Sequence, residues 1–202
     1  MNPNEVCFHG KVSVGMVKLC ISFQYIGDRG GAIVVNRISS FHVGVAAEAF
    51  VATQFARCGY DVSVQYGANQ PEYDLMIARD DKLMKVSVKG SQDGAWGLTQ
   101  GFLKNADYHK ATSDWLNKHS KNTVFAFVQF MDVPLDESPR LYLAFPTEIA
   151  DVLKSISRGR GDSVLYENKV WGKTANGYGT VDKIPAEWKF TPERIEQVLQ
   201  QL

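Results

Sequence analysis

The sequence is poor in cysteine and contains neither a long apolar run nor a signal peptide. Three of its 202 residues are cysteine, and this odd number with irregular spacing favours a reducing compartment over a disulfide framework. No stretch approaches the roughly 20 apolar residues of a membrane-spanning helix. The N-terminus lacks the ordered charged, apolar and small-residue regions of a signal peptide. We therefore expect a cytoplasmic protein with no membrane partner.

The chain also has no excess of either charge. Lysine plus arginine and aspartate plus glutamate each number 22, so the formal net charge is zero. This balance argues against a large surface that coats DNA non-specifically, but it leaves room for a local basic groove. Hydrophobic residues make up 45% of the chain, which suits one globular domain that folds without disulfides or a structural metal.

Hydrophobic periodicity predicts alternating helices and strands. The stretch from Val43 to Cys58 has an apolar stripe at helical spacing and ends before Gly59. Strands are expected at 60–66, 72–78, 83–89, 123–131 and 140–145, and helices at 105–119, at 146–155 and from Thr191 onward. The order α-β-β-β-α-β-β-α predicts an α/β domain with a mixed central sheet flanked by helices.

Three regions follow from this pattern. Residues 1–40 form either an extra hairpin or a weakly structured extension, residues 41–156 form the α/β core, and residues 157–202 form a small appendage of hairpin and helix. In the appendage, Val164 to Trp171 is expected to pair with Tyr178 to Val181 around Asn176-Gly177.

A tight hairpin predicts the register of the two strands before and after Asp80-Asp81. With a two-residue turn, Arg79 faces Lys82 and Asp74 lies opposite Ser87. Lys89 then lies on the same face as Ser87, one pleat further along. An odd-length turn would break this arrangement.

The residues at this end of the hairpin suit phosphodiester hydrolysis. Glu48 lies at the flank of the apolar stripe of the preceding helix, from which it can reach Asp74 and Lys89. Carboxylate oxygens are preferred ligands of magnesium, and a lysine can orient the attacking water and offset developing negative charge. The three side chains therefore predict a site for metal-assisted hydrolysis.

These elements resemble the core of the PD-(D/E)xK nuclease superfamily, in the style of its Holliday-junction-resolvase-like and intron-endonuclease-like members. The resemblance covers about residues 43–130 and rests on Glu48, Gly59-Tyr60, Tyr73-Asp74-Leu75 and Val86-Ser87-Val88-Lys89-Gly90. It implies a restriction-endonuclease-like fold, with Asp74 as the main metal ligand and Glu48 as a ligand directly or through water. It also implies the backbone carbonyl of Val88 as a ligand, Lys89 as the catalytic lysine, and Mg²⁺ or Mn²⁺ as the cofactor.

Two positions depart from the family's pattern. Tyr73 replaces a proline, which is common among relatives, and Ser87 stands where the family usually has Glu, Asp or Gln. A serine hydroxyl is a weak, neutral ligand, so either Glu48 compensates for it or the metal is bound weakly. A further alternative is a domain that has lost catalysis and only binds nucleic acid. The neutral net charge leaves a protein-interaction domain as a third hypothesis.

Other residues have accessory roles in this interpretation. Gln92 and its neighbour Ser91 are candidates for contact with the scissile phosphate, and Arg158 and Arg160 for phosphate contacts elsewhere, each with a plainer interpretation as a polar loop residue. Ser87 is an accessory residue of the site, with a passive role rather than that of a nucleophile. Trp171 and nearby aromatic residues either stack on bases or cover a satellite core. The expected partner is DNA. A homodimer is also considered, since two strands need two sites.

Overall fold

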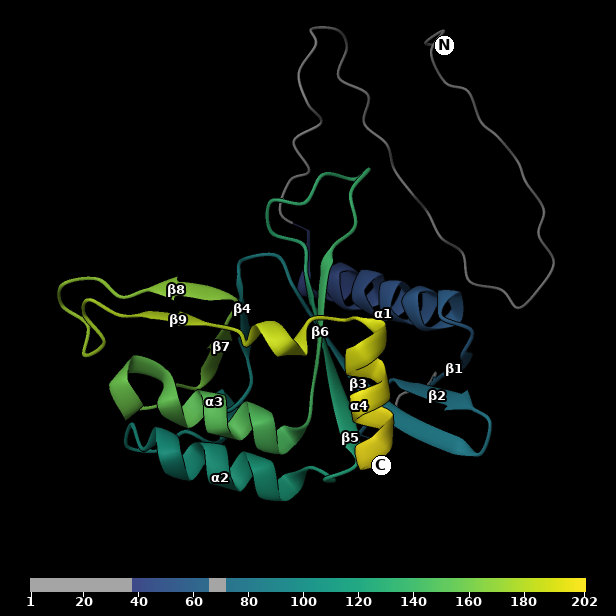
Figure 1. Cartoon of the computed structure of the whole chain (residues 1–202). Helices are drawn as coiled ribbons and strands as arrows, with labels where there is room; N and C mark the ends of the chain where they lie inside the picture. The colour runs from purple at the N-terminus through teal and green to yellow at the C-terminus, as the bar shows by residue number, and fades with distance from the viewer. Residues whose placement is uncertain (1–37, 66–71) are drawn as a thin grey trace, which may run out of the picture. The chain divides into compact units, whose positions relative to one another are not determined.

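The computed structural model describes residues 38–65 and 72–202, which are coloured in Figure 1. The expectation for residues 1–40 therefore lies almost entirely outside the described residues. The helices are α1 (Ser40–Arg57), α2 (Tyr108–Lys118), α3 (Pro146–Gly159) and α4 (Pro192–Gln201), with short 3-10 helices η1 (Gln100–Phe102) and η2 (Ala186–Trp188). The strands are β1 (Asp61–Val64), β2 (Leu75–Arg79), β3 (Lys82–Ser91), β4 (Ala95–Gly97), β5 (Thr123–Gln129), β6 (Arg140–Ala144), β7 (Val164–Tyr166), β8 (Asn168–Val170) and β9 (Val181–Lys183).

The central sheet has five strands in the order β1-β2-β3-β5-β6. The pair β3–β5 is parallel and the other neighbours are antiparallel, so the sheet is mixed, as predicted. The crossover from β3 to β5 includes α2, which is the connection that a parallel pair requires. Two small two-stranded sheets, β4–β7 and β8–β9, complete the described strands.

Helix α1 covers one face of the sheet, together with α4 (Figure 1). Ser39 caps α1 by accepting a hydrogen bond from the backbone N–H of His42, and Gly59 follows the helix with φ of 82°, a conformation that favours glycine. The buried residues of α1 and α4 pack against alternate residues of the strands in a core that includes Val51, Phe55, Val86, Val88, Val124, Leu143, Ile195 and Leu199.

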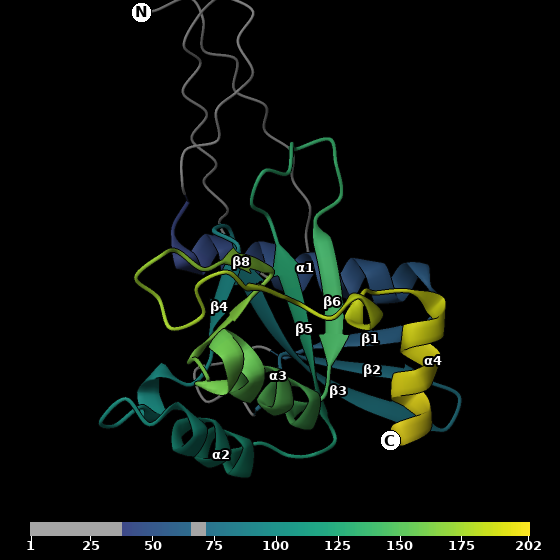
Figure 2. The same cartoon turned by 60° about the vertical axis from the view of Figure 1, so that its left-hand side comes forward.

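Helices α2 and α3 cover the opposite face and lie side by side (Figures 1 and 2). The core on this side is rich in aromatic residues, among them Trp96, Trp115, Phe125, Phe127 and Trp188. Phe125 and Phe127 are the β5 neighbours of Ser87 and Lys89 in the parallel register. Since neighbouring residues in register share a face, Ser87 and Lys89 lie on the α2–α3 face of the sheet.

The appendage differs from the sequence-based prediction. A single strand over Val164 to Trp171 was expected, but the segment divides into β7, which pairs with β4, and β8, which pairs with β9. The predicted hairpin is confirmed for β8 and β9. The first part of the segment differs because Trp96 and its neighbours, about 70 residues earlier in the chain, supply the partner strand for β7. The sequence also predicts that Cys58, at the end of the first helix, is a small core residue, but in the structure it is exposed.

Candidate active site

Asp74 immediately precedes β2 and faces β3. The register places Leu75 opposite Val86 and Arg79 opposite Lys82, as the two-residue turn predicts. The paired residues end at Leu75, and the backbone N–H of Asp74 donates to the Val86 carbonyl at 2.9 Å. The Asp74 side chain lies beside the next residues of β3. Its Oδ2 accepts a hydrogen bond from the backbone N–H of Val88 at 2.6 Å, and the Ser87 hydroxyl lies 3.5 Å from the same oxygen. The carboxylate is therefore held against β3 by its second oxygen.

The carbonyl of Val88 is directed to the same side of β3 as Asp74. In an extended strand the N–H and C=O of one residue point to the same side, and the Val88 N–H points to the Asp74 carboxylate. The Val88 side chain packs in the core beneath α1 and is 7% exposed, so this part of the backbone is held in place. The carbonyl oxygen is accordingly available to the space that Asp74 borders.

Lys89 follows on the face that Ser87 shares. Its side chain is half-buried, and its backbone carbonyl accepts a hydrogen bond from the indole Nε1 of Trp96 at 3.0 Å. This bond connects β3 to β4 and fixes the backbone where the lysine side chain departs. The position is a rigid one, as a catalytic side chain requires.

Glu48 approaches the same place from α1, in the layer on the other face of the sheet. Burial raises the pKa of the Glu48 carboxyl above its ordinary value of 4.5, the negative charge of Asp74 raises it further, and the positive charge of Lys89 lowers it. Because both charges act on Glu48, the three groups form one electrostatic cluster. Asp74 and Lys89 thus both lie within electrostatic range of Glu48.

Gly90 permits this close approach of α1 to β3. A Cβ atom at position 90 would lie 2.8 Å from the Val43 carbonyl oxygen and 2.9 Å from the Ala47 Cβ. Both distances are shorter than ordinary van der Waals contacts, so no larger residue fits without moving the helix. Glycine at this position allows α1, and with it Glu48, to lie near Lys89.

The oxygen donors of this cluster suit a hard cation of modest affinity. Among the residues that the structure describes, no group of three or more His, Cys, Asp or Glu side chains is arranged to hold a metal. The donors at hand are two carboxylates, from Glu48 and Asp74, with the Val88 carbonyl and the Ser87 hydroxyl beside them. Magnesium accepts such a set because it keeps several waters and needs only one or two carboxylates.

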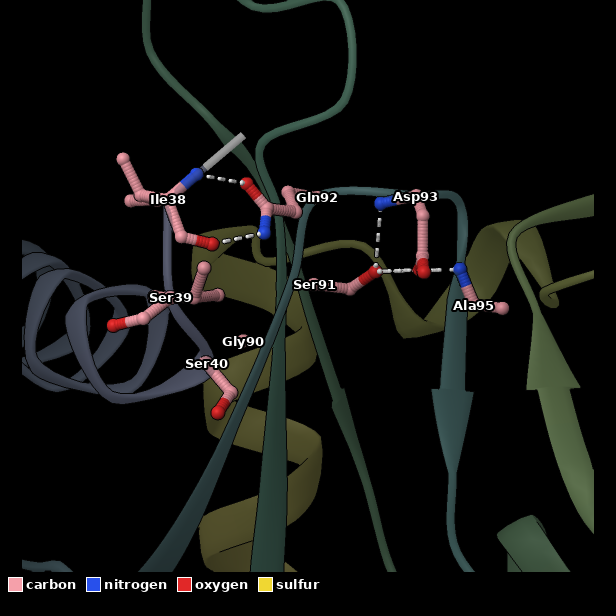
Figure 3. A pocket seen from close by; sticks show the side chains of 9 residues that line it. Ile38, Ser39, Ser40, Gly90, Ser91, Gln92, Asp93 and Ala95 are labelled. Carbon is pink, nitrogen blue, oxygen red and sulfur yellow. Dashed lines mark hydrogen bonds between the residues drawn. The ribbon is translucent and has the colours of Figure 1, made fainter. Parts of the chain in front are cut away.

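A pocket of about 620 Å³ lies beyond Lys89, between the start of α1 and the segment after β3 (Figure 3). Gln92, an expected accessory residue, lines this pocket. Its amide accepts a hydrogen bond from Ile38 N at 3.2 Å and donates one to Ile38 O at 2.7 Å. The amide therefore holds the chain entering α1, and contact of Gln92 with a phosphate stays a prediction.

The structure also reveals a pair next to Asp74 that the sequence did not indicate. The Glu72 carboxylate accepts a hydrogen bond from Ser120 N at 2.9 Å and contacts His119 Nδ1 at 3.0 Å. The His119 ring lies against Trp115 and Phe125. This contact ties the segment before Asp74 to the end of α2. A separation of 47 residues between Glu72 and His119 carries no local sequence signal.

Arg158 and Arg160 lie in the appendage, apart from this cluster. The Arg158 guanidinium donates to the Tyr178 carbonyl at 2.7 Å, and that of Arg160 lies 3.5 Å from Asp162. Both residues remain exposed. Their proposed contact with phosphates is a separate question from the chemistry at Asp74.

No protein-family model matches the chain, and no curated protein matches it. Its structure is similar to that of a bacterial homing endonuclease. The match has 14% sequence identity and a TM-score of 0.43, and covers 81% of this chain and 95% of the other. Similarity at this level does not establish an activity for this chain. Membership of the PD-(D/E)xK superfamily therefore stays a prediction. No described helix is long and apolar enough to cross a membrane.

Proposed function

We propose that this protein is a metal-dependent endonuclease, or a nuclease-like DNA-processing protein, that hydrolyses phosphodiester bonds. The observation that supports this proposal is the Asp74 carboxylate, which is held by the Val88 N–H next to Lys89, with Glu48 close enough for the charges of Asp74 and Lys89 to shift its pKa. An acid pair beside a lysine, with Glu48 on a helix, Lys89 in a strand and Asp74 immediately before another, has the chemistry that phosphodiester hydrolysis needs.

In this proposal Asp74 and Glu48 hold Mg²⁺ or Mn²⁺ together with the Val88 carbonyl. A bound cation of this kind polarises the phosphate and makes water a better nucleophile. The Lys89 ammonium orients the attacking water and offsets negative charge on the phosphate oxygens. Asp74 already accepts a hydrogen bond from Val88 at one oxygen, so its orientation is set before substrate arrives.

A nucleic-acid-binding module without catalysis is the second candidate, and Ser87 favours it. Ser87 is 3% exposed and its hydroxyl faces the Asp74 carboxylate, where a third acid would complete the donor set. Without that acid a cation is held by two carboxylates only. Tight DNA binding with no metal-dependent cleavage, unrestored by Ser87→Glu, would support this candidate.

Cleavage of a DNA panel separates the two candidates. Plasmid, linear, single-stranded and four-way-junction DNA are incubated with the protein and Mg²⁺ or Mn²⁺. We expect cleavage by the wild type and a loss of roughly 100-fold or more in Lys89→Ala. Asp74→Asn should be as deficient, and it keeps an oxygen acceptor for Val88 N–H, so that its fold is preserved.

Asp81→Ala is the matched control, because Asp81 is exposed in the turn at the other end of the same hairpin. It should cleave as the wild type does. Full activity in Asp74→Asn or Lys89→Ala would refute the site. If the nuclease acts on both strands of a duplex, two copies are needed, and sedimentation with and without DNA would reveal the homodimer.

A further inference from the structure

A second feature of the molecule lies in the appendage, where the turn that ends α3 packs on the hairpin β8–β9. In Figure 1 this hairpin projects beyond the end of α3. The residues between Arg158 and Lys183 include five cations and three acids, in a chain whose overall charge is zero. This local excess of positive charge favours the binding of an anionic partner at the segment.

The turn at the end of α3 is held in an unfavourable backbone conformation. Ser157 and Arg158 adopt φ values of 56° and 58°, in the left-handed region that non-glycine residues rarely occupy. The hairpin supports this turn, because Asp182 Oδ2 accepts a hydrogen bond from Ser157 N at 2.9 Å and the Tyr178 carbonyl accepts one from Arg158. Strain retained in this way is typical of functional segments, and here it presents Arg158 at the surface.

Trp171 lies between two cations. The Arg160 guanidinium is 5.8 Å from the centre of the Trp171 ring, and the Lys169 ammonium is 5.5 Å from it. Arg160 also lies 4.9 Å from the Tyr108 ring, and Lys169 lies 5.2 Å from the Tyr166 ring. Cations placed over aromatic rings are ordered without losing their charge. Because these side chains are already ordered, they lose less conformational entropy when they bind an anion.

The three acids of the segment are engaged within the protein. Asp162 Oδ1 accepts hydrogen bonds from the backbone N–H groups of Ser163 and Val164, and its other oxygen faces Arg160 at 3.5 Å. Asp182 accepts from Ser157 N and from the Trp171 indole. Glu167 forms a two-bond pair with Arg140.

The cations have fewer such contacts. Arg158 and Arg160 are exposed and Lys169 is half-exposed. Of these three cations, Arg160 faces an acid, Asp162, whereas Asp182 and Glu167 are engaged with other groups of the protein.

The segment is connected to the candidate active site by side chains packed on the α2–α3 face of the sheet. Trp96 donates to the Lys89 carbonyl and pairs in register with Leu165 of β7. The next residue, Tyr166, contacts the Trp171 ring at 5.9 Å between centroids. A short run of packed side chains thus leads from the Lys89 backbone to the cations around Trp171.

We propose that Arg158, Arg160 and Lys169, which we call the hairpin surface, bind the phosphate backbone of a nucleic acid beside the candidate active site. The phosphate geometry suits arginine in particular, because a guanidinium donates two parallel hydrogen bonds to one phosphate. Contacts of this kind position a nucleic acid without reading its sequence. The inference deepens the proposed function by naming where the substrate is held, and it can be tested without cleavage.

The test measures the binding of a fluorescently labelled DNA duplex by anisotropy, in EDTA and over a range of salt concentrations. For wild type, the logarithm of the association constant should fall with the logarithm of salt. In Arg158→Gln/Arg160→Gln/Lys169→Gln we expect the salt slope to decrease by about 3 and the affinity at 0.1 M salt to fall ~100-fold. The charge-conserving variant Arg158→Lys/Arg160→Lys/Lys169→Arg should keep the wild-type slope.

Two further variants keep the test decisive. If the neutral triple variant does not fold, Lys169→Gln alone should reduce the slope by about 1. Arg57→Gln/Lys82→Gln is the matched control, because these exposed cations lie at the end of α1 and at the β2–β3 turn, at the far end of β3 from Gly90. It should bind as the wild type does.

The outcomes separate this inference from the proposed nuclease. Wild-type binding that is unchanged in the neutral variants, or no salt-dependent binding by wild type, would overturn the hairpin surface. Cleavage measured in parallel with Mg²⁺ decides the nuclease separately. Binding that depends on Arg158, Arg160 and Lys169 without any cleavage would support the hairpin surface and refute the nuclease.

Discussion

Replacing Gly90 with alanine tests how closely α1 packs on β3. The new Cβ would lie 2.8 Å from the Val43 carbonyl oxygen and 2.9 Å from both Val43 Cγ1 and Ala47 Cβ. One of these atoms belongs to the helix backbone, so the whole first part of α1 must shift. Overpacking of this kind costs about 1–3 kcal/mol, against a gain of about 0.4–1 kcal/mol from the stiffer unfolded chain. We expect a net destabilisation of ~1–2 kcal/mol.

Gly44→Ala provides the matched control within α1. A Cβ at position 44 meets no atom within 4 Å, and glycine inside a helix costs about 0.5–1 kcal/mol relative to alanine. Thermal unfolding should therefore shift in opposite directions in the two variants. For a chain of about 200 residues, 1 kcal/mol corresponds to roughly 2–4 °C. Unfolding of Gly90→Ala at or above the wild-type temperature would refute the close packing of α1 on β3.

The same variant links packing to activity. Because the shift of α1 carries Glu48 away from Asp74 and Lys89, Gly90→Ala should lose DNA cleavage at temperatures where it is fully folded. Gly44→Ala should keep it. Loss of stability with undiminished cleavage would mean that the position of Glu48 is not important for the chemistry.

Two more predictions concern titration and a buried ion pair. In the metal-free protein the Glu48 pKa should exceed 4.5 and should fall in Asp74→Asn, since the Asp74 charge raises it. NMR titration of the carboxyl groups measures both values, and an unchanged pKa would contradict the cluster. A pKa raised by folding means that the Glu48 contribution to stability is present at low pH and is lost as pH rises through the folded pKa, so Glu48→Gln should stabilise the protein at pH 7. Arg194, 5% exposed, donates to Glu148 at 2.6 Å and to the Leu143 carbonyl. Arg194→Met should therefore lower the free energy of unfolding by ~2–4 kcal/mol in urea denaturation, whereas an unchanged midpoint would show that the pair contributes nothing.

Local patterns were sufficient to predict the elements that form the sheet. The strand register of β2 and β3 followed from a two-residue turn, and the structure confirms Arg79 opposite Lys82. Side chains alternate with a period of two, so this pair alone predicts that Asp74 lies opposite Ser87. In the structure the paired residues end at Leu75, but the Ser87 hydroxyl lies 3.5 Å from the Asp74 carboxylate. The start of α4 after Thr191 was equally local, because a capping side chain and a proline define a helix start.

Contacts between distant segments could not be predicted from local sequence patterns. The pairing of β7 with β4 joins Leu165 to Trp96, and no local period encodes a partner so far away. The hydrogen bonds between the Gln92 amide and the Ile38 backbone also depend on where the chain enters α1. The local sequence around Gln92 is the same whether its amide contacts a phosphate or the backbone of Ile38, so it could not distinguish the two.

The sequence by itself determined which side chains could meet at the end of the β2–β3 hairpin, because strand period and turn length are local properties. Tertiary structure decided that Glu48 joins them, since its approach depends on the packing of α1 over Gly90 and on the burial that raises its pKa. It also placed Arg160 and Lys169 around Trp171. Both outcomes depend on distances between elements, which are set by close packing in the core and have no counterpart in the order of residues along the chain.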